Sequence, residues 1–126
     1  MNLTRLLILH AVVTFAAGVV LIVTPGLIPG SVNIHLNPEA NLLCYLLGAC
    51  EVSLAVLSYY GTKLRNVEAI QLICLTFIVL HSLTAAVEIY AFSQGASAKI
   101  WGNIALRIVV SGLFIYYGIA KKSKVL

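Results

Sequence analysis

Residues 70–92 are the stretch that most constrains this chain, because a nearly unbroken apolar run there carries His81 and Glu88. A helix needs roughly 20 apolar residues to cross the hydrocarbon core of a bilayer, and this run is long enough. The spacing between His81 and Glu88 places them about 20° apart on one face of a helix. A charged side chain at the centre of a membrane costs roughly 2.5–3.5 kcal/mol, so we expect this face to find partners within the protein.

Composition extends the membrane interpretation to the whole chain. Hydrophobic residues make up 61% of the sequence and charged residues only 10%, against roughly 25% charged residues in soluble domains. Further apolar runs cover about residues 3–23, 41–60 and 100–120. We therefore expect an all-α polytopic membrane protein, a single domain over residues 1–126 that forms a four-transmembrane-helix bundle. The linker at residues 24–40 is rich in proline and glycine, which predicts no regular helix; we expect it on the membrane surface or over the bundle mouth.

Basic residues gather at the predicted helix ends and form no basic face. One side of the membrane would hold Arg5, Lys63, Arg65, Lys121, Lys122 and Lys124, and the other only Lys99. Cytoplasmic loops are rich in Lys and Arg, so both termini are expected in the cytoplasm. The net charge of +4 therefore indicates orientation rather than nucleic-acid binding. The terminal lysines are also placed to touch anionic lipid headgroups.

Two short phrases recur in the same order in each half of the chain. The recurring pairs are Leu9-His10-Ala11 with Leu80-His81-Ser82, and Tyr59-Tyr60-Gly61 with Tyr116-Tyr117-Gly118. Both halves would start on the cytoplasmic side. The recurrence favours two tandem helical hairpins, related by a pseudo-twofold axis along the membrane normal.

Polar side chains fall within the apolar runs and form the candidate site. These residues are His10, Glu51, His81, Glu88, Asn103 and Arg107. Small and polar residues recur around them at helical spacing, which lets helices approach closely and hydrogen-bond to one another. Because arginine does not deprotonate, we expect Arg107 to pair with Glu88 or Glu51. The same contacts would also suit a purely structural role that fixes helix packing.

This polar interior supports three functional hypotheses. The first is a site for a small lipophilic ligand such as a lipid, quinone or sterol-like compound, held by Glu51, His81 and Arg107. The second is a haem protein with His10 and His81 as axial ligands. The third is proton-coupled transport of a small molecule by a dimer, with Glu51 as the titrating group. No other metal site and no specific cofactor is indicated.

Other features of the sequence bear on whether the protein is an enzyme and whether it assembles with other chains. The sequence has no Ser/His/Asp order, Gly-rich phosphate loop or Glu-x-x-His motif, which favours a non-enzymatic role. The small-residue face that contains Gly48 and Ala55 suits a homodimer. Membership of a larger membrane complex as an accessory subunit is an equally open alternative to ligand binding.

The layout resembles that of small DoxX-like, four-helix bacterial membrane proteins. The shared features are a first helix with His10 and Gly18 that ends at Pro25, and Leu47, Gly48 and Glu51 in a Leu-Gly-x-x-Glu phrase. The resemblance implies a bacterial inner-membrane protein. Some members are subunits of quinone-linked oxidoreductases, which implies an accessory role here and no catalytic residues. Arg107 departs from the family pattern.

Overall fold

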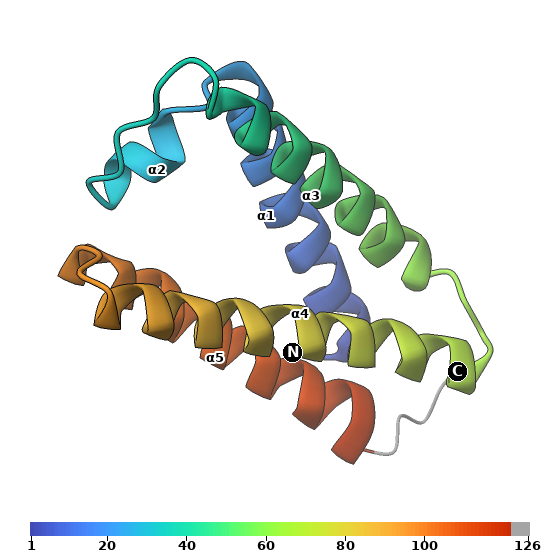
Figure 1. Cartoon of the computed structure of the whole chain (residues 1–126). Helices are drawn as coiled ribbons and strands as arrows, with labels where there is room; N and C mark the ends of the chain where they lie inside the picture. Colours follow the sequence, from blue (N-terminus) through green and yellow to red (C-terminus); the bar gives the residue numbers. More distant parts are fainter. Residues whose placement is uncertain (122–126) are drawn as a thin grey trace. The chain divides into compact units, whose positions relative to one another are not determined.

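The computed structural model describes residues 1–121, and these residues contain helices and no strand (Figure 1). Four helical segments are long and apolar enough to cross a membrane: α1 (Leu3–Val23), α3 (Asn41–Gly61), α4 (Val67–Ser93) and Ala98–Ala120. The last segment combines η1 (Ala98–Ile100), α5 (Trp101–Phe114) and η2 (Ile115–Ala120), which is a π-helix. The prediction of an all-α fold with four membrane spans is confirmed, and the chain is a multi-pass membrane protein.

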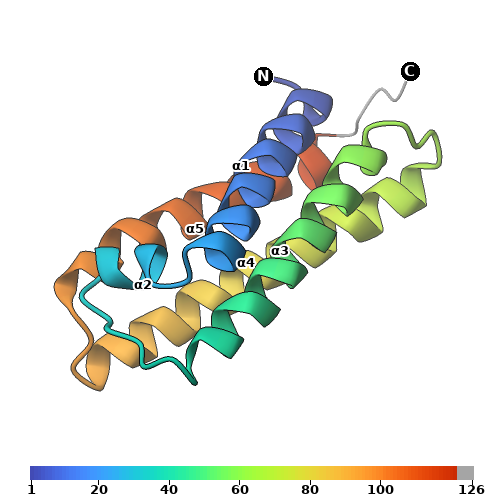
Figure 2. The same cartoon turned by 90° about the horizontal axis from the view of Figure 1, so that it is seen from above.

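The chain divides into two compact units. One comprises residues 7–62, and the other comprises residues 1–6 together with the chain from Lys63 onward. A helical hairpin forms the main part of each unit: α1 with α3 in the first, and α4 with α5 in the second (Figure 2). The predicted pair of tandem hairpins is therefore present.

Local side chains set the helix boundaries. Asn66 is the N-cap of α4, and its side chain accepts a hydrogen bond of 3.0 Å from the backbone N–H of Ala69. Asparagine is among the preferred N-cap residues, so α4 begins at Val67, ahead of the expected residue 70. After α4 ends at Ser93, Gly95 adopts a φ of 101°. Glycine enters this region without steric cost, and the chain turns there towards η1.

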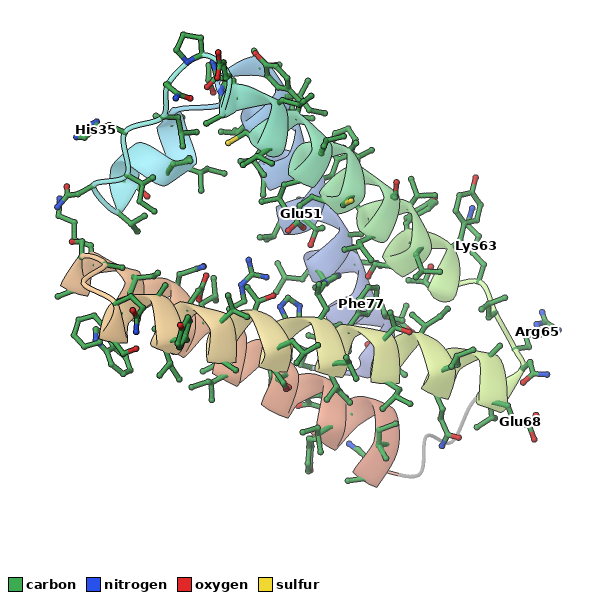
Figure 3. The ribbon with its side chains drawn as sticks, in the orientation of Figure 1. His35, Glu51, Lys63, Arg65, Glu68 and Phe77 are labelled. Atoms are coloured by element: carbon green, nitrogen blue, oxygen red, sulfur yellow. The ribbon has the colours of Figure 1, made fainter. Side chains whose placement is uncertain are left out.

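The linker between α1 and α3 differs from the sequence prediction. It contains a short helix, α2 (Leu27–Ser31), so the expectation that residues 24–40 hold no regular helix is wrong over this segment. Pro29 is the third residue of α2, where its missing N–H removes no intrahelical hydrogen bond. Asn33, with a φ of 64°, follows shortly after the helix. His35 lies in the loop beyond α2 and is exposed (Figure 3).

Basic side chains mark one end of the α4–α5 hairpin. Figure 3 shows Lys63 and Arg65 at the connection that leads into α4, with Glu68 in the first turn of that helix. At the C-terminal end of η2, the Nζ atom of Lys121 lies 5.8 Å from the ring centroid of Tyr117. The predicted basic residues Lys122 and Lys124 lie outside the described residues.

Candidate functional site

The helices α4 and α5 pack antiparallel to one another, and their side chains meet at successive positions along both helices. The Phe77 and Phe114 rings lie 5.2 Å apart, and further along α4 the hydroxyls of Ser82 and Ser111 are 2.9 Å apart. At the far end of α4, the rings of Phe92 and Trp101 lie 5.4 Å apart. Four predicted site residues fall within this register, and we call His81, Glu88, Asn103 and Arg107 the polar row.

The first contact of the polar row joins Arg107 to His81. The Arg107 Nη1 atom lies 3.3 Å from His81 Nδ1. A guanidinium only donates hydrogen bonds, so His81 Nδ1 must accept and must carry the lone pair. The hydrogen-bond geometry therefore assigns His81 as a neutral imidazole with its proton on Nε2.

The second contact joins Asn103 to Glu88. The Asn103 Nδ2 group donates a short hydrogen bond to Glu88 Oε1. The expected ion pair between Glu88 and Arg107 does not form within the described residues. The register of the two helices explains this outcome, because Asn103 lies opposite Glu88 and the Arg107 side chain reaches His81 instead.

Each of the two charged side chains in the polar row keeps one polar atom without a partner. Glu88 Oε2 and Arg107 Nε are both buried and have no hydrogen-bond partner in the described part of the chain. Each side chain is anchored at the same time through another atom, Oε1 of Glu88 and Nη1 of Arg107. The polar row therefore presents one unpartnered carboxyl oxygen and one unpartnered N–H donor, each on an anchored side chain.

Apolar side chains border the polar row. Phe77 and Phe114 are fully buried, and the His81 ring stacks on Phe114 with 6.4 Å between centroids and 9° between planes. Ala85 and Ile104 belong to a buried apolar cluster and lie between the two polar contacts in sequence. These neighbours keep the polar row in a low-dielectric setting, where an unpartnered polar atom is especially costly.

The α1–α3 hairpin holds the other two predicted site residues. His10 Nδ1 lies 3.1 Å from Ser58 Oγ, and Ser58 Oγ donates a 2.9 Å hydrogen bond to the backbone carbonyl of Leu7. The single hydroxyl proton of Ser58 is thereby used, so Ser58 Oγ accepts from His10 Nδ1–H. His10 is assigned the tautomer opposite to that of His81, with its lone pair on Nε2. Glu51 is half-buried on α3 (Figure 3).

Close backbone contact fixes α1 against α3. A Cβ atom built on Gly18 would lie 2.8 Å from the Gly48 carbonyl oxygen, and one built on Gly48 would lie 2.8 Å from the Gly18 carbonyl oxygen. Only glycine at both positions permits this approach. Glu51 follows Gly48 by less than one helical turn, so the contact fixes the part of α3 that carries Glu51.

The sequence did not identify the aromatic neighbours of the polar row. Phe77 precedes His81 by four residues, and this spacing places both on one helix face. The spacing was the available signal, but a phenylalanine in an apolar run is equally compatible with a lipid-facing position.

Among residues 1–121, no three His, Cys, Asp or Glu side chains gather in a way that suits a metal ion.

Comparison of the chain with protein-family models, with characterised proteins and with solved structures found no match. What the protein does must therefore be inferred from its own side chains.

Proposed function

We propose that this protein binds a small lipophilic ligand through the polar row of the α4–α5 hairpin. The observation that carries the proposal is the pair of buried, unpartnered atoms Glu88 Oε2 and Arg107 Nε. Leaving a buried polar group without a partner costs about 1–3 kcal/mol, and more when the group is charged. The hydrocarbon core offers no water to satisfy such groups, so a ligand that pairs with both atoms would be strongly favoured.

The geometry of the polar row supports binding by preorganised groups. Glu88 and Arg107 each have one polar atom already held by a neighbour, Asn103 and His81 respectively. A ligand would therefore not have to order these long side chains, and that ordering commonly costs about 0.5–1.5 kcal/mol per side chain. An accessory-subunit role, which the DoxX-like resemblance implies, would use the same atoms, with a helix of a partner protein supplying the missing donor and acceptor.

Haem ligation by both histidines fits less well. An axial histidine presents a nitrogen lone pair to iron, and in His81 the Nδ1 lone pair faces Arg107 while Nε2 carries the proton. His10 has a suitable tautomer, since Ser58 holds its Nδ1–H and the lone pair is on Nε2. A pair of axial ligands would require His81 to give up its contact with Arg107.

Proton-coupled transport through Glu51 by a dimer stays a prediction from the sequence. It requires that wild-type protein in liposomes show a flux driven by a pH gradient, and that Glu51→Gln abolish that flux. A wild-type protein without flux, or a Glu51→Gln variant with full flux, would contradict the transport hypothesis.

Native mass spectrometry of detergent-purified protein tests the binding proposal. We expect wild-type protein to carry an additional small-molecule mass that is lost in Glu88→Leu and in Arg107→Leu. Thr76→Val is the matched control, because Thr76 is exposed on α4 and its hydroxyl bonds to Leu72 of the same helix. Circular dichroism establishes that the variants are folded. An equal mass in all four proteins, or none in the wild type, would contradict the proposal; a bound protein subunit would favour the accessory role.

The proposed orientation follows from charge. Arg5, Lys63, Arg65 and Lys121 would lie at the cytoplasmic surface and Lys99 at the opposite surface, consistent with the bias of basic residues in membrane proteins. Both termini would then be cytoplasmic, in a bacterial inner membrane if the DoxX-like resemblance holds. Fusions of a reporter that is active only in the cytoplasm should be active at either terminus and inactive when inserted at residue 96.

A further inference from the structure

The short helix α2 has no buried residue, although it begins with three apolar side chains. Leu27 is 62% exposed and Ile28 is 40% exposed, and Ile34, just beyond the helix, is 44% exposed. In Figure 1, α2 lies off the end of the α1–α3 hairpin. We call residues 24–34 the α2 segment. Large apolar side chains that are exposed close together mark a surface that contacts another molecule or a membrane.

The α2 segment carries no charged side chain. The sequence has no Asp, Glu, Lys or Arg between Arg5 and Glu39, so the segment continues the uncharged character of α1. The connection between α3 and α4 differs, because it is short and contains Lys63 and Arg65, both exposed. The composition of the α2 segment therefore suits contact with lipid better than it suits a loop in water.

The backbone of the α2 segment satisfies its hydrogen bonds locally. The N–H groups of Gly30, Val32 and Ile34 donate to carbonyl oxygens within the segment over 2.9, 3.1 and 3.0 Å. Pro25 and Pro29 have no N–H group to satisfy. A backbone that moves out of water must find its partners within the protein, and these contacts meet that requirement.

The two hydroxyl groups of the α2 segment are also satisfied within the chain. Thr24 Oγ1 donates a 3.1 Å hydrogen bond to the carbonyl oxygen of Val20, and Ser31 Oγ donates a 2.6 Å hydrogen bond to that of Ile28. A buried hydroxyl that keeps its hydrogen bond avoids most of the cost of leaving water. Neither hydroxyl therefore prevents the segment from entering an apolar environment.

Chain connectivity holds the α2 segment at the edge of the bilayer. The membrane span α1 ends at Val23, which is 71% exposed, and α2 begins four residues later. Four residues reach at most about 14 Å. The next span begins at this same end, and Leu42 and Leu43 in its first turn are 59% and 68% exposed. The apolar surface of the α2 segment is thus continuous along the chain with the lipid-facing surfaces of two membrane spans.

We infer that the α2 segment lies in the bilayer interface, with Leu27, Ile28 and Ile34 in contact with the upper part of the lipid acyl chains. Helices of this kind bury their apolar side chains roughly 5–10 Å into the boundary between head groups and acyl chains. The segment has no basic residue that would select anionic head groups. His35, in the exposed loop beyond α2 (Figure 3), would lie on the water side. Lipid contact by the α2 segment does not depend on ligand binding by the polar row.

Tryptophan fluorescence in vesicles measures the depth of the α2 segment. The chain contains one tryptophan, Trp101, so Trp101→Phe provides a background without tryptophan emission. Single tryptophans are then introduced by Ile28→Trp in α2, by His35→Trp in the loop, and by Leu83→Trp at a 62% exposed position within α4 as the deep reference. Each protein is reconstituted into phosphatidylcholine vesicles, and circular dichroism establishes that it is folded. Quenching is measured with bromines near the head group, with bromines at mid-chain, and with aqueous acrylamide.

Each quencher has a distinct expected result. Bromines near the head group should quench Ile28→Trp about two-fold more than His35→Trp, and acrylamide should show the reverse order, because an interfacial helix lies below the water boundary. Leu83→Trp should be quenched most by the mid-chain bromines. Equal quenching of Ile28→Trp and His35→Trp would overturn the inference. An Ile28→Trp signal shielded from both bromines and acrylamide would also overturn it, because protein would then cover α2.

A second variant and a second lipid sharpen the test. Leu27→Trp repeats the measurement on the same helix if Ile28→Trp fails to fold. Replacing part of the phosphatidylcholine by anionic phosphatidylglycerol should leave the quenching of either variant unchanged, because the segment has no basic residue. Quenching by bromines that appears only when phosphatidylglycerol is present would contradict insertion through apolar side chains.

Discussion

Replacing Gly18 by alanine should force α1 and α3 apart. A Cβ atom on Gly18 would lie 2.8 Å from the Gly48 carbonyl oxygen and 2.8 Å from Val52 Cγ2. Alanine at position 48 would create the reciprocal conflict, with Cβ 2.8 Å from the Gly18 carbonyl oxygen and 2.7 Å from Ile22 Cγ1. Backbone atoms cannot rotate away as a side chain does, so the helices themselves must move.

The size of the effect follows from these distances. Ordinary contacts of a Cβ atom begin at 3.4 Å, and the Cβ atom on Gly18 would lie at 2.8 Å. The two helices must therefore move apart by about 0.6 Å, the difference between these two distances. Overpacking of this kind costs about 1–3 kcal/mol. Alanine regains up to about 1 kcal/mol of helix propensity relative to glycine. We therefore expect Gly18→Ala to lower the free energy of unfolding by up to about 2 kcal/mol, which is the overpacking cost less the gain in helix propensity.

Reversible unfolding in mixed dodecylmaltoside and sodium dodecyl sulfate micelles, followed by circular dichroism, measures this difference. Gly102→Ala and Gly112→Ala are matched controls within the membrane span Ala98–Ala120, because a Cβ atom at either position meets nothing within 4 Å. Both controls should leave stability unchanged or slightly higher. The Gly18→Ala/Gly48→Ala double variant should lose less than the two single losses combined, because one separation relieves both conflicts. A Gly18→Ala variant as stable as Gly112→Ala would refute the reasoning.

Two further substitutions test individual contacts in the same unfolding assay. Ser58→Ala removes the acceptor of the buried His10 Nδ1–H and should lower the free energy of unfolding by about 1–3 kcal/mol. Ser53→Ala is the control and should change it little, because Ser53 is exposed and its hydroxyl bonds within its own helix. Equal stability of these two variants would contradict the assigned role of Ser58. Gly118→Ala would place a Cβ atom 2.6 Å from Cys74 Sγ and should cost about 1–3 kcal/mol. Adding Cys74→Ala should recover part of that loss, and a purely additive result would count against this contact.

The membrane-spanning helices were predictable from the sequence for a simple physical reason. An apolar run long enough to cross a bilayer has no water to satisfy its backbone, so it must satisfy its hydrogen bonds internally as a helix. Local details could not be predicted from the apolar runs alone. The start of α4 depends on the capping side chain of Asn66. The prolines of the linker predict no regular helix, but Pro29 falls in the first turn of α2, where proline is tolerated.

The polar row was predictable as a set of residues but not as a set of contacts. Helical spacing places His81 with Glu88, and Asn103 with Arg107, each on one face of a helix. Which side chains meet depends on the register between the two helices, and that register is set by packing such as the Phe77–Phe114 contact. The sequence does not indicate whether a phenylalanine within an apolar run faces lipid or protein, so the register could not be predicted from the sequence.

The NMR signal of Arg107 Nε–H tests the proposed ligand site most directly. The chain contains three arginines, at positions 5, 65 and 107, so the side-chain Nε–H region of a ¹⁵N-labelled sample is simple, and Arg107→Lys assigns the signal. Titration with hexadecanol, a lipophile whose hydroxyl oxygen accepts hydrogen bonds, should shift the Arg107 Nε–H proton downfield as it gains an acceptor, while the signals of Arg5 and Arg65 stay in place. Binding of hexadecanol without a shift at Arg107, or an equal shift at all three arginines, would contradict a ligand site in the polar row.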